Sequence, residues 1–443
     1  MLRMTRFGKV RPRIASTASC VIGVWLSACG SGGDPSLSGA AGAGGSSDTV
    51  VGSVSGASAS AGNPSPSGGP SGGGSFSSAG TSSVAGGPAL SNAGAGGALS
   101  SAGAGGGTSG AGSAQAGATT ASEPASCAPG GPGMNTCGAD GHESCCISLL
   151  VEGGTFARTY ANTGSGATGK ADNATVSSFR LDKYEVTVGR LRQFVNYLAG
   201  GGAPPTAGSG KHAHLNGGKG LADSSKAGTF EPGWDASWNE NLPTGADALA
   251  NWTKNLACSS CTYGTWTAKA GGDEDLPVTF LDWYEAHAFC IWDGGFLPSE
   301  AEWRYAAAGG DEQRMYPWGT TAPGTDSKYA MYDCYYPSGK PGNCTSLANV
   351  AKVGTASLGG GRWGQLDLSG SVWEWNLDVY SPKFDSTCSD CAHLTGGSER
   401  VLPGGGFHTG LMPYMLASSR TQVDYATTYR GDYGVGVRCA RTP

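Results

Sequence analysis

The sequence predicts an α+β domain with little regular secondary structure, preceded by a disordered tether. Glycine accounts for 78 of the 443 residues, and glycine favours turns and irregular backbone over long helices. Charged residues make up 14% of the chain, against about 25% in a typical soluble domain. Eleven of the 12 tryptophans lie between Trp234 and Trp375, so the core is expected in the second half of the chain.

Residues 1–28 have the pattern of a bacterial lipoprotein signal peptide. Residues 1–13 carry five basic side chains and no acid, and a short apolar run, Ile14–Leu26, follows. The run ends in Leu26-Ser27-Ala28-Cys29, which resembles a lipobox. We therefore expect Cys29 to be lipidated, with the membrane as a partner through this anchor. The expected location is the bacterial outer membrane, at the cell surface or facing the periplasm. The alternative is a plain signal peptide cut elsewhere, with Cys29 incidental.

Residues 29–126 are predicted to be a disordered tether. They consist mainly of Gly, Ala and Ser, and their charged residues are Asp34, Asp48 and Glu123. Such a composition buries too little apolar surface to offset the entropy of ordering the chain. A flexible chain of this length has a root-mean-square reach of roughly 50–60 Å, enough to hold a domain away from a membrane.

The segment that follows the tether contains patterns for individual elements. Phe179–Tyr184 alternates apolar and polar residues, as a strand does. Three segments are expected to be helices, and a capping box of Ser299 with Glu302 precedes the last of them: Val188–Leu198, Trp283–Trp292 and Glu300–Ala308. His212 and His214 lie in a Gly/Lys-rich loop, which we expect to be solvated.

The charge of the chain argues against a nucleic-acid partner, and its hydropathy argues against a membrane-spanning helix. The net charge is −6, and no basic run occurs outside the leader, so nucleic acid is not an expected partner. No apolar stretch reaches the length of a spanning helix. Fourteen cysteines favour an oxidising compartment and disulfides.

Eight segments, taken in order, resemble one family. They are Phe179-Arg-Leu-Asp-Lys-Tyr-Glu-Val-Thr-Val188, Pro277-Val-Thr-Phe-Leu-Asp-Trp283, Ala288-Phe-Cys-Ile-Trp292, Leu297-Pro-Ser-Glu-Ala-Glu-Trp-Arg-Tyr-Ala306, Tyr316-Pro-Trp-Gly319, Leu366-Asp-Leu-Ser-Gly-Ser-Val-Trp-Glu-Trp375, Gly404-Gly-Gly-Phe407 and Gly434-Val-Gly-Val-Arg-Cys439. The set is similar to the sulfatase-modifying-factor domain, the domain of the formylglycine-generating enzyme. The resemblance covers residues 147–443, after a small Cys-rich pre-domain at 127–146, and implies a fold related to C-type lectins.

The resemblance also implies a chemistry that this sequence does not support. The family's enzyme resembles a copper oxidase that uses two cysteines just after the glycine-rich turn, because thiolates are the ligands that Cu(I) prefers. Here Thr409 stands at the first position, and the second falls between Met412 and Tyr414. No cysteine occurs between Cys391 and Cys439. We therefore expect no catalytic cysteine and no copper.

The remaining cysteines are expected to form disulfides. The resemblance implies a bridge between Cys290 and Cys439, and Cys334 with Cys344 is expected to close a loop. Cys258 with Cys261 and Cys388 with Cys391 are interpreted as disulfides, with a four-thiolate zinc site as the alternative. Four cysteines of the pre-domain are expected to form two bridges of open connectivity: Cys127, Cys137, Cys145 and Cys146.

The Trp-Glu-Trp segment resembles the family's calcium-binding loop. The matching residues are Asp367, Gly370, Val372 and Glu374, and two carboxylates with backbone carbonyls are suitable calcium ligands. We therefore expect a structural calcium ion. The alternative is that Asp367 caps a turn and Glu374 faces solvent.

These observations favour a surface-anchored binding module without oxidase activity. Its partner is expected to be a peptide, a glycan or another envelope protein, bound in a groove near Phe407, His408, Tyr414 and Arg420. One alternative is an oxidase of the formylglycine-generating type that acts on a sulfatase or another protein cysteine with altered metal ligands. A structural spacer of the envelope is a further alternative.

Overall fold

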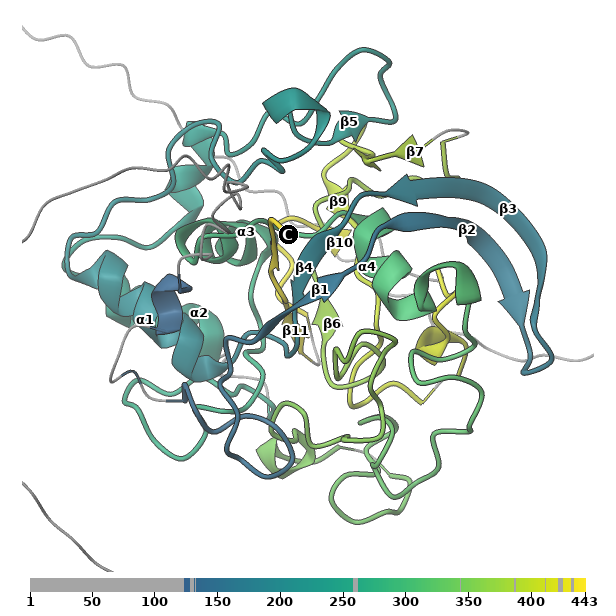
Figure 1. Ribbon diagram of the computed structural model, residues 1–443. Coiled ribbons are helices and arrows are strands. Elements are labelled where there is room, and N and C mark those ends of the chain that lie inside the picture. The colour runs from purple at the N-terminus through teal and green to yellow at the C-terminus, as the bar shows by residue number, and fades with distance from the viewer. Residues whose placement is uncertain are drawn as a thin grey trace, which may run out of the picture. The chain divides into compact units, whose positions relative to one another are not determined.

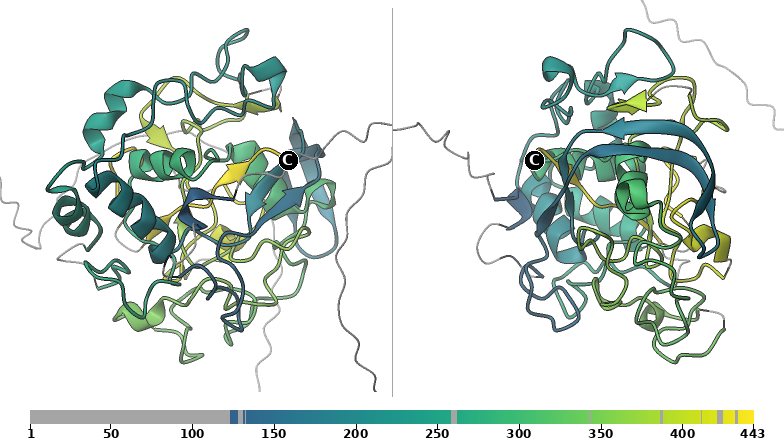
Figure 2. Two further views of the ribbon diagram at one scale, coloured as in Figure 1. Left: turned by 60° about the vertical axis from the view of Figure 1, so that its left-hand side comes forward. Right: turned by 45° about the vertical axis from the view of Figure 1, so that its right-hand side comes forward.

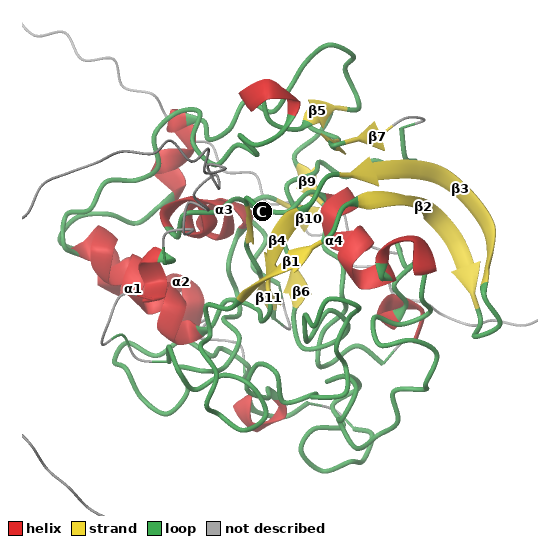
Figure 3. Ribbon diagram, in the orientation of Figure 1, coloured by secondary structure: helices red, strands yellow, loops and turns green. Residues whose placement is uncertain are grey.

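The computed structural model describes residues 123–127, 131, 133–257, 262–342, 344–385, 388–410, 412–420, 425–431 and 434–443. It contains helices and several small sheets joined by long loops (Figure 1, Figure 3), which confirms the predicted α+β class. Cys29, residues 30–122 of the predicted tether and the Cys258–Cys261 pair lie outside the described residues. The prediction that the tether extends to residue 126 is wrong at its end, because Ser126 is buried and its amide donates to Asp293. Within the described part, no helix has the length and apolar character needed to cross a membrane.

A three-stranded antiparallel sheet lies near the centre of the domain. Its order is β1 (Ser148–Val151), β4 (Phe179–Asp182) and β12 (Ala440–Arg441). Leu181 of β4 stands opposite both Leu149 and Ala440. The strand predicted at Phe179–Tyr184 is therefore the central strand of this sheet, and it joins the first and last strands of the domain, which pair with its two edges.

A long curved hairpin forms a second sheet. It consists of β2 (Gly154–Asn162) and β3 (Ala167–Val176), and the short strand β7 (Cys388–Ser389) pairs with β3. The hairpin curves around helix α4 (Glu300–Ala308) (Figures 1 and 2). Phe156 of the hairpin packs edge-on against Tyr305 of α4, with ring centroids 5.3 Å apart.

Helices α1 (Val188–Ala199), α2 (Ala248–Ala257) and α3 (Trp283–Trp292) lie on the opposite side of the central sheet from the hairpin (Figure 1). The helices predicted at Val188–Leu198, Trp283–Trp292 and Glu300–Ala308 are confirmed. Ser299 and Glu302 form the expected capping box, and α1 and α3 begin after side-chain caps of their own. Helix α2 was not predicted, and Trp252 on it packs against Phe194 of α1.

The other regular elements are short. The two-residue strands form three pairs: β5 (Ala222–Asp223) with β8 (Cys391–Ala392), β6 (Trp373–Glu374) with β11 (Val435–Gly436), and β9 (Glu399–Arg400) with β10 (Tyr425–Ala426). Single 3₁₀ turns occur at Ala125–Cys127, Asn216–Gly218, Ala236–Asn241, Gly310–Glu312, Leu347–Asn349 and Met412–Met415. Loops therefore carry most of the residues that could form a site.

Five disulfides join the ten described cysteines. The structure pairs Cys290 with Cys439, Cys334 with Cys344, and Cys388 with Cys391. In the pre-domain it pairs Cys127 with Cys146 and Cys137 with Cys145. Cys388 and Cys391 are bonded to each other, so the alternative that they supply thiolates to zinc is wrong.

Four charged residues form a buried cluster where α1, α3 and the ends of β4 and β12 meet. Arg190 is fully buried and pairs with Asp182 at 2.9 Å and with Asp293 at 2.6 Å. Arg441 pairs with the same two aspartates, at 3.2 and 2.6 Å. Arg190 also donates to the Ser126 hydroxyl and the Cys145 carbonyl, which binds the pre-domain to this cluster. We call Asp182, Arg190, Asp293 and Arg441 the balanced cluster.

Candidate functional site

Thr409 lies in a tight turn that follows the glycine run 404–406. Its hydroxyl accepts a hydrogen bond from the Gly406 amide at 2.8 Å, and its own amide donates to the Gly406 carbonyl at 2.8 Å. The residue is 5% exposed. The threonine side chain therefore closes its own turn, and it has no thiol to offer a soft metal ion.

A hollow of about 400 Å³ lies beside this turn. It is lined by Tyr263, Asp333, Cys334, Gly342, Cys344, His408 and Gly410. The Cys334–Cys344 disulfide forms part of its wall, so neither sulfur is available as a thiolate. The hollow offers a polar surface and an aromatic ring rather than a redox centre.

Three of the four predicted groove residues line a row of adjoining hollows. His408 lines the hollow above and a smaller one that includes Trp373. Trp373 also lines a third hollow, together with Tyr414 and Arg420. Arg420 continues into a fourth and larger hollow. The described residues thus place His408, Tyr414 and Arg420 along one stretch of surface.

Phe407 does not belong to this row. It is 1% exposed and packs against Tyr263, with ring centroids 5.5 Å apart. It lines none of the four hollows. The expectation that Phe407 lines the groove is therefore wrong, because its ring anchors the turn in the core instead.

The predicted calcium loop is a tight turn with surplus negative charge. Asp367, Gly370 and Ser371 all have left-handed backbone, with φ of 62°, 90° and 64°. Glu374 is fully buried, so the alternative that it faces solvent is wrong. Both of its carboxylate oxygens accept from Arg438 at 2.7 Å.

Two further carboxylates share that single guanidinium. Glu185 accepts from the Ser371 hydroxyl at 2.7 Å and from the Val372 amide at 3.1 Å. Burial, followed by repulsion from Asp367 and Glu374, raises the pKa of Glu185 well above its usual value. Burial also raises the pKa of Asp367 to about 6. The loop therefore has a surplus of carboxyl groups over guanidinium groups, and the raised pKa values reflect how costly a full negative charge is there without a further cation.

This surplus and its oxygen donors suit calcium, but only part of the expected ligand set fits. Arg438 already holds Glu374, whereas Asp367 accepts one hydrogen bond, from the Gly354 amide at 2.6 Å. An ion here would depend on Asp367 and on the backbone carbonyls of Gly370 and Val372. Within the described ranges, no group of three or more His, Cys, Asp or Glu side chains is arranged to hold a metal ion.

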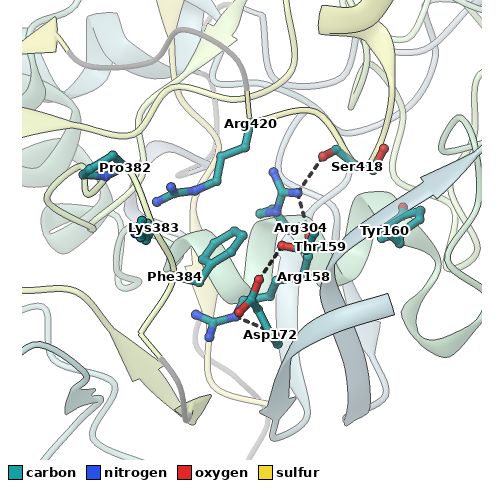
Figure 4. Close-up of a pocket in the computed structure, with 10 residues that line it drawn as sticks. All are labelled: Arg158, Thr159, Tyr160, Asp172, Arg304, Pro382, Lys383, Phe384, Ser418 and Arg420. Atoms are coloured by element: carbon teal, nitrogen blue, oxygen red, sulfur yellow. Dashed lines mark hydrogen bonds between the residues drawn. The ribbon is translucent and has the colours of Figure 1, made fainter. Parts of the chain in front are cut away.

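The fourth hollow is a pocket of about 390 Å³, of whose lining the sequence analysis named Arg420 alone (Figure 4). Arg158 and Asp172 come from the hairpin and Arg304 from α4, and the segments that carry Phe384 and Arg420 complete its wall. We call this the arginine pocket. Its residues are up to 262 positions apart, from Arg158 to Arg420, so no local pattern could have found it. Arg304 is the other hint of this pocket in the sequence, because it places a cation inside helix α4, which was otherwise predicted well.

His212 lies in the core and not in a solvated loop. It is fully buried, and its two ring nitrogens lie 3.0 Å from carboxylate oxygens of Glu231 and Glu302. Coulombic attraction to these two carboxylates raises its pKa to about 10 in spite of the burial, which acts in the opposite direction. The expectation of a solvated loop is therefore wrong for His212, which two glutamates distant in sequence hold as a buried cation, whereas Ala213 and residues 216–219 are exposed.

The described residues thus form a disulfide-bonded α+β domain with a row of polar hollows and no free described thiol. A family model for the sulfatase-modifying factor enzyme 1-like domain matches residues 135–443. The chain belongs to this family.

Several curated relatives have different activities in their names. A formylglycine-generating enzyme of Streptomyces coelicolor is 32% identical over 151 residues, covering 32% of this chain and 47% of its own. An inactive C-alpha-formylglycine-generating enzyme 2 of Mus musculus is 33% identical over 108 residues, covering 24% and 34%. A hercynine oxygenase of Mycobacterium tuberculosis is 32% identical over 173 residues, covering 38% and 37%. The match spans about half the length, or less, of each relative.

Solved structures with similar chain traces include PvdO from Pseudomonas aeruginosa, with 16% identity and a TM-score of 0.40. That match covers 67% of this chain and 94% of PvdO. Treponema denticola variable protein 1 has 16% identity and a TM-score of 0.38, with 67% and 95% covered.

Proposed function

We propose that this domain is a binding module displayed by a lipid anchor, and that it lacks the oxidase activity of its enzymatic relatives. The carrying observation is that all ten described cysteines are in disulfides. The position that the resemblance assigns to a catalytic cysteine holds Thr409, whose hydroxyl is used within its own turn. A copper oxidase of this type needs thiolates, and these residues supply none.

The row of hollows supports a binding role. His408, Trp373, Tyr414 and Arg420 offer rings and a cation along one surface, and aromatic and arginine side chains are the types that most often anchor partners. We infer a peptide, a glycan or another envelope protein as the partner. The leader and Cys29 support display at the outer membrane, at the cell surface or facing the periplasm.

Mass spectrometry distinguishes this proposal from the oxidase alternative. The purified chain is incubated with a peptide carrying a sulfatase cysteine motif, Cu(I) and oxygen, and the S. coelicolor formylglycine-generating enzyme serves as the positive control. We expect the control to convert the cysteine and this chain to leave it unchanged. Conversion by this chain at a rate near that of the control would establish the oxidase alternative.

The anchor is tested separately by fractionation. The full chain is expected in the membrane fraction, and Cys29→Ser is expected in the soluble fraction. A full chain that is soluble from the start would contradict the lipoprotein part of the proposal and leave the binding role in place.

We also propose that the Asp367 loop binds a structural calcium ion. The support is the surplus of buried carboxyl groups around Arg438 together with the tight left-handed turn at Asp367, Gly370 and Ser371. The ion would act on stability rather than on chemistry, and its test is given in the Discussion.

A further inference from the structure

Two arginines of the arginine pocket are buried without an ion pair. Among the described residues, neither Arg158 nor Arg304 makes an ion pair. Arg158 donates to the backbone carbonyls of Asp172 and Asp385, at 2.9 and 2.7 Å. Arg304 donates to the carbonyls of Arg158, Ser418 and Ser419. Carbonyl dipoles hold these guanidinium groups in place, and the carboxylates of Glu300, Asp378 and Asp172 attract Arg158 without forming an ion pair with it.

The acidic groups nearby are already engaged. Glu300 pairs with Arg420 at 2.7 Å, and Asp172 accepts from the Thr159 hydroxyl. Asp385 lies 2.9 Å from His393. Asp378 accepts from the Glu300 and His393 amides, and burial raises its pKa to about 7, so it carries only part of a negative charge at neutral pH.

Arg304 also has a polar atom without a partner. The side chain is 2% exposed, and its Nε makes no hydrogen bond. A buried donor on a charged group that lacks an acceptor destabilises the fold until an acceptor is supplied. Burial lowers the pKa of Arg304, attraction to Glu300 and Tyr160 acts in the opposite direction, and the neighbouring Arg420 and Arg158 lower it further. An anion in the pocket would relieve that repulsion.

One aromatic ring gathers the three guanidinium groups (Figure 4). The Cζ atoms of Arg420, Arg158 and Arg304 lie 4.1, 4.4 and 5.5 Å from the centroid of Phe384. The ring face stabilises cations beside it, and it keeps three like charges at one wall of the pocket. The exposed Lys383 adds a fourth cation at the rim.

We propose that the arginine pocket is a binding site for the oxyanion group of a small polar ligand, such as a carboxylate or a phosphate. Guanidinium groups bind both through paired charge-assisted hydrogen bonds. The volume of about 390 Å³ falls in the range of small-ligand sites, about 300–1,000 Å³, so the ligand is the size of an acidic monosaccharide rather than a bare ion. This inference deepens the proposed binding role by naming the chemical class of its ligand.

Isothermal titration calorimetry on the full chain tests it with three probes at matched chloride: sodium glucuronate, glucose and inorganic phosphate. We expect glucuronate to bind and glucose, its neutral counterpart, to give no heat. Phosphate binding at equal or higher affinity would identify a site for the free anion. Weaker phosphate binding would identify a sugar acid as the better ligand. Each anion is titrated to about 10 mM, ten times a dissociation constant of about 1 mM. No heat with either anion over this range would overturn the proposal.

Two variants and a control assign the binding to this pocket. Arg158→Gln removes a lining cation and is expected to weaken glucuronate at least tenfold. Arg362→Gln removes the same charge from an exposed arginine outside the pocket, paired with Asp311, and should leave affinity within twofold. Equal weakening by both variants would show general charge attraction and overturn the site.

Asp172→Asn gives a test of opposite sign, which a folding defect does not imitate. It removes the pocket's lining carboxylate, and Asn accepts both the hydrogen bond from Thr159 and the left-handed backbone at φ 54°. We expect it to strengthen anion binding at least threefold. Weakened or unchanged binding would contradict the proposal even if Arg158→Gln failed to fold. If the chain oxidised the sulfatase peptide yet bound glucuronate, the proposed lack of oxidase activity would fail and this inference would stand.

Discussion

The domain buries arginines in two different ways. In the balanced cluster, Arg190 and Arg441 face Asp182 and Asp293, and every pairing is between opposite charges. In the arginine pocket, Arg158 and Arg304 are equally hidden, at 5% and 2% exposure, but they bond only to neutral carbonyls among the described residues. Burial is the same in both regions, and the charge balance differs.

This difference separates a structural role from a binding role. A buried ion pair with all partners present is complete, and removing one partner leaves an uncompensated charge. A buried cation without an ion pair gains a partner of opposite charge only when an anion binds from solvent. The Asp367 loop is the mirror case, since three carboxylates there share one guanidinium. Surplus charge, and not buried charge as such, therefore marks the places where a ligand or an ion is expected.

The strongest test of the structural region removes the bridge beside it. The Cys290–Cys439 disulfide joins α3 to the residue before β12, across 149 residues of sequence. Helix α3 and strand β12 are two of the four elements that meet at the balanced cluster. Loss of both sulfurs by Cys290→Ala with Cys439→Ala should lower the free energy of unfolding by about 5 kcal/mol in the chain-entropy model. Urea unfolding measures it. The Cys388–Cys391 pair, only three residues apart, is the control, with about 2 kcal/mol expected. Equal losses from both pairs would mean that loop length does not matter here.

The balanced cluster itself is tested by Arg190→Ala. The change removes one of the two arginine partners of each buried aspartate and a donor to the Ser126 hydroxyl. It should lower the free energy of unfolding, measured in urea, by about 3–5 kcal/mol. Arg362→Ala, at an ion pair with a one-third exposed arginine, should cost less than about 1 kcal/mol. A loss near that of the control would show that Arg441 alone compensates both aspartates.

The Asp367 loop should respond to calcium. Calcium at 100 times its dissociation constant would stabilise the fold by about 2.7 kcal/mol, seen as a higher melting temperature than in chelator. The pKa of Asp367 is raised to about 6, so the carboxyl is protonated below that pH. The calcium effect should therefore be larger at pH 8 than at pH 5.

Asp367→Asn is the matched variant for this loop. It keeps an acceptor for the Gly354 amide and tolerates the left-handed backbone, and should abolish the calcium response. Asp311→Asn, at an exposed acid, should retain it. Identical melting temperatures in calcium and chelator would remove the ion and leave Asp367 as the cap of its turn.

The smallest effect on stability is expected in the arginine pocket. Arg158→Gln loses two hydrogen bonds to carbonyls and the attraction to Glu300, Asp378 and Asp172, but it also relieves repulsion from Arg420 and Arg304. Its cost without ligand should be about 1 kcal/mol, well below that of Arg190→Ala. A cost as large as that of Arg190 would mean that this arginine is structural, and the contrast between the two regions would fail.

Local signals accounted for much of the fold. Helices α1, α3 and α4 were predicted because their apolar spacing or their caps lie within one segment, as at Ser299 with Glu302. The central strand β4 was predicted from its own alternation. The ordered family motifs added the domain and the Cys290–Cys439 pair, which no local pattern could show.

The rest depends on contacts between distant segments. The β3 strand, Ala167–Val176, contains Gly, Lys, Asp and Asn, and it is held in the hairpin by pairing with β2, whose Phe156 packs on α4. His212 was expected in solvent because its loop is rich in Gly and Lys, yet Glu302, 90 residues away, buries it. Arg158 and Arg304 are 146 residues apart. Composition indicates the conformation and exposure that a segment would adopt alone. The conformation and burial of these residues are set by contacts with segments distant in sequence.

The β2–β3 hairpin has a consequence for how this protein can change. It supplies both Arg158 and Asp172 to the arginine pocket, on adjacent strands joined by a short turn, while the balanced cluster and the Cys290–Cys439 bridge lie on other elements. Substitutions at these two positions can alter the charge of the pocket without touching the residues that hold the domain together. On the proposed binding role, exchange of this single hairpin would change which ligands the pocket accepts while the scaffold keeps its stability.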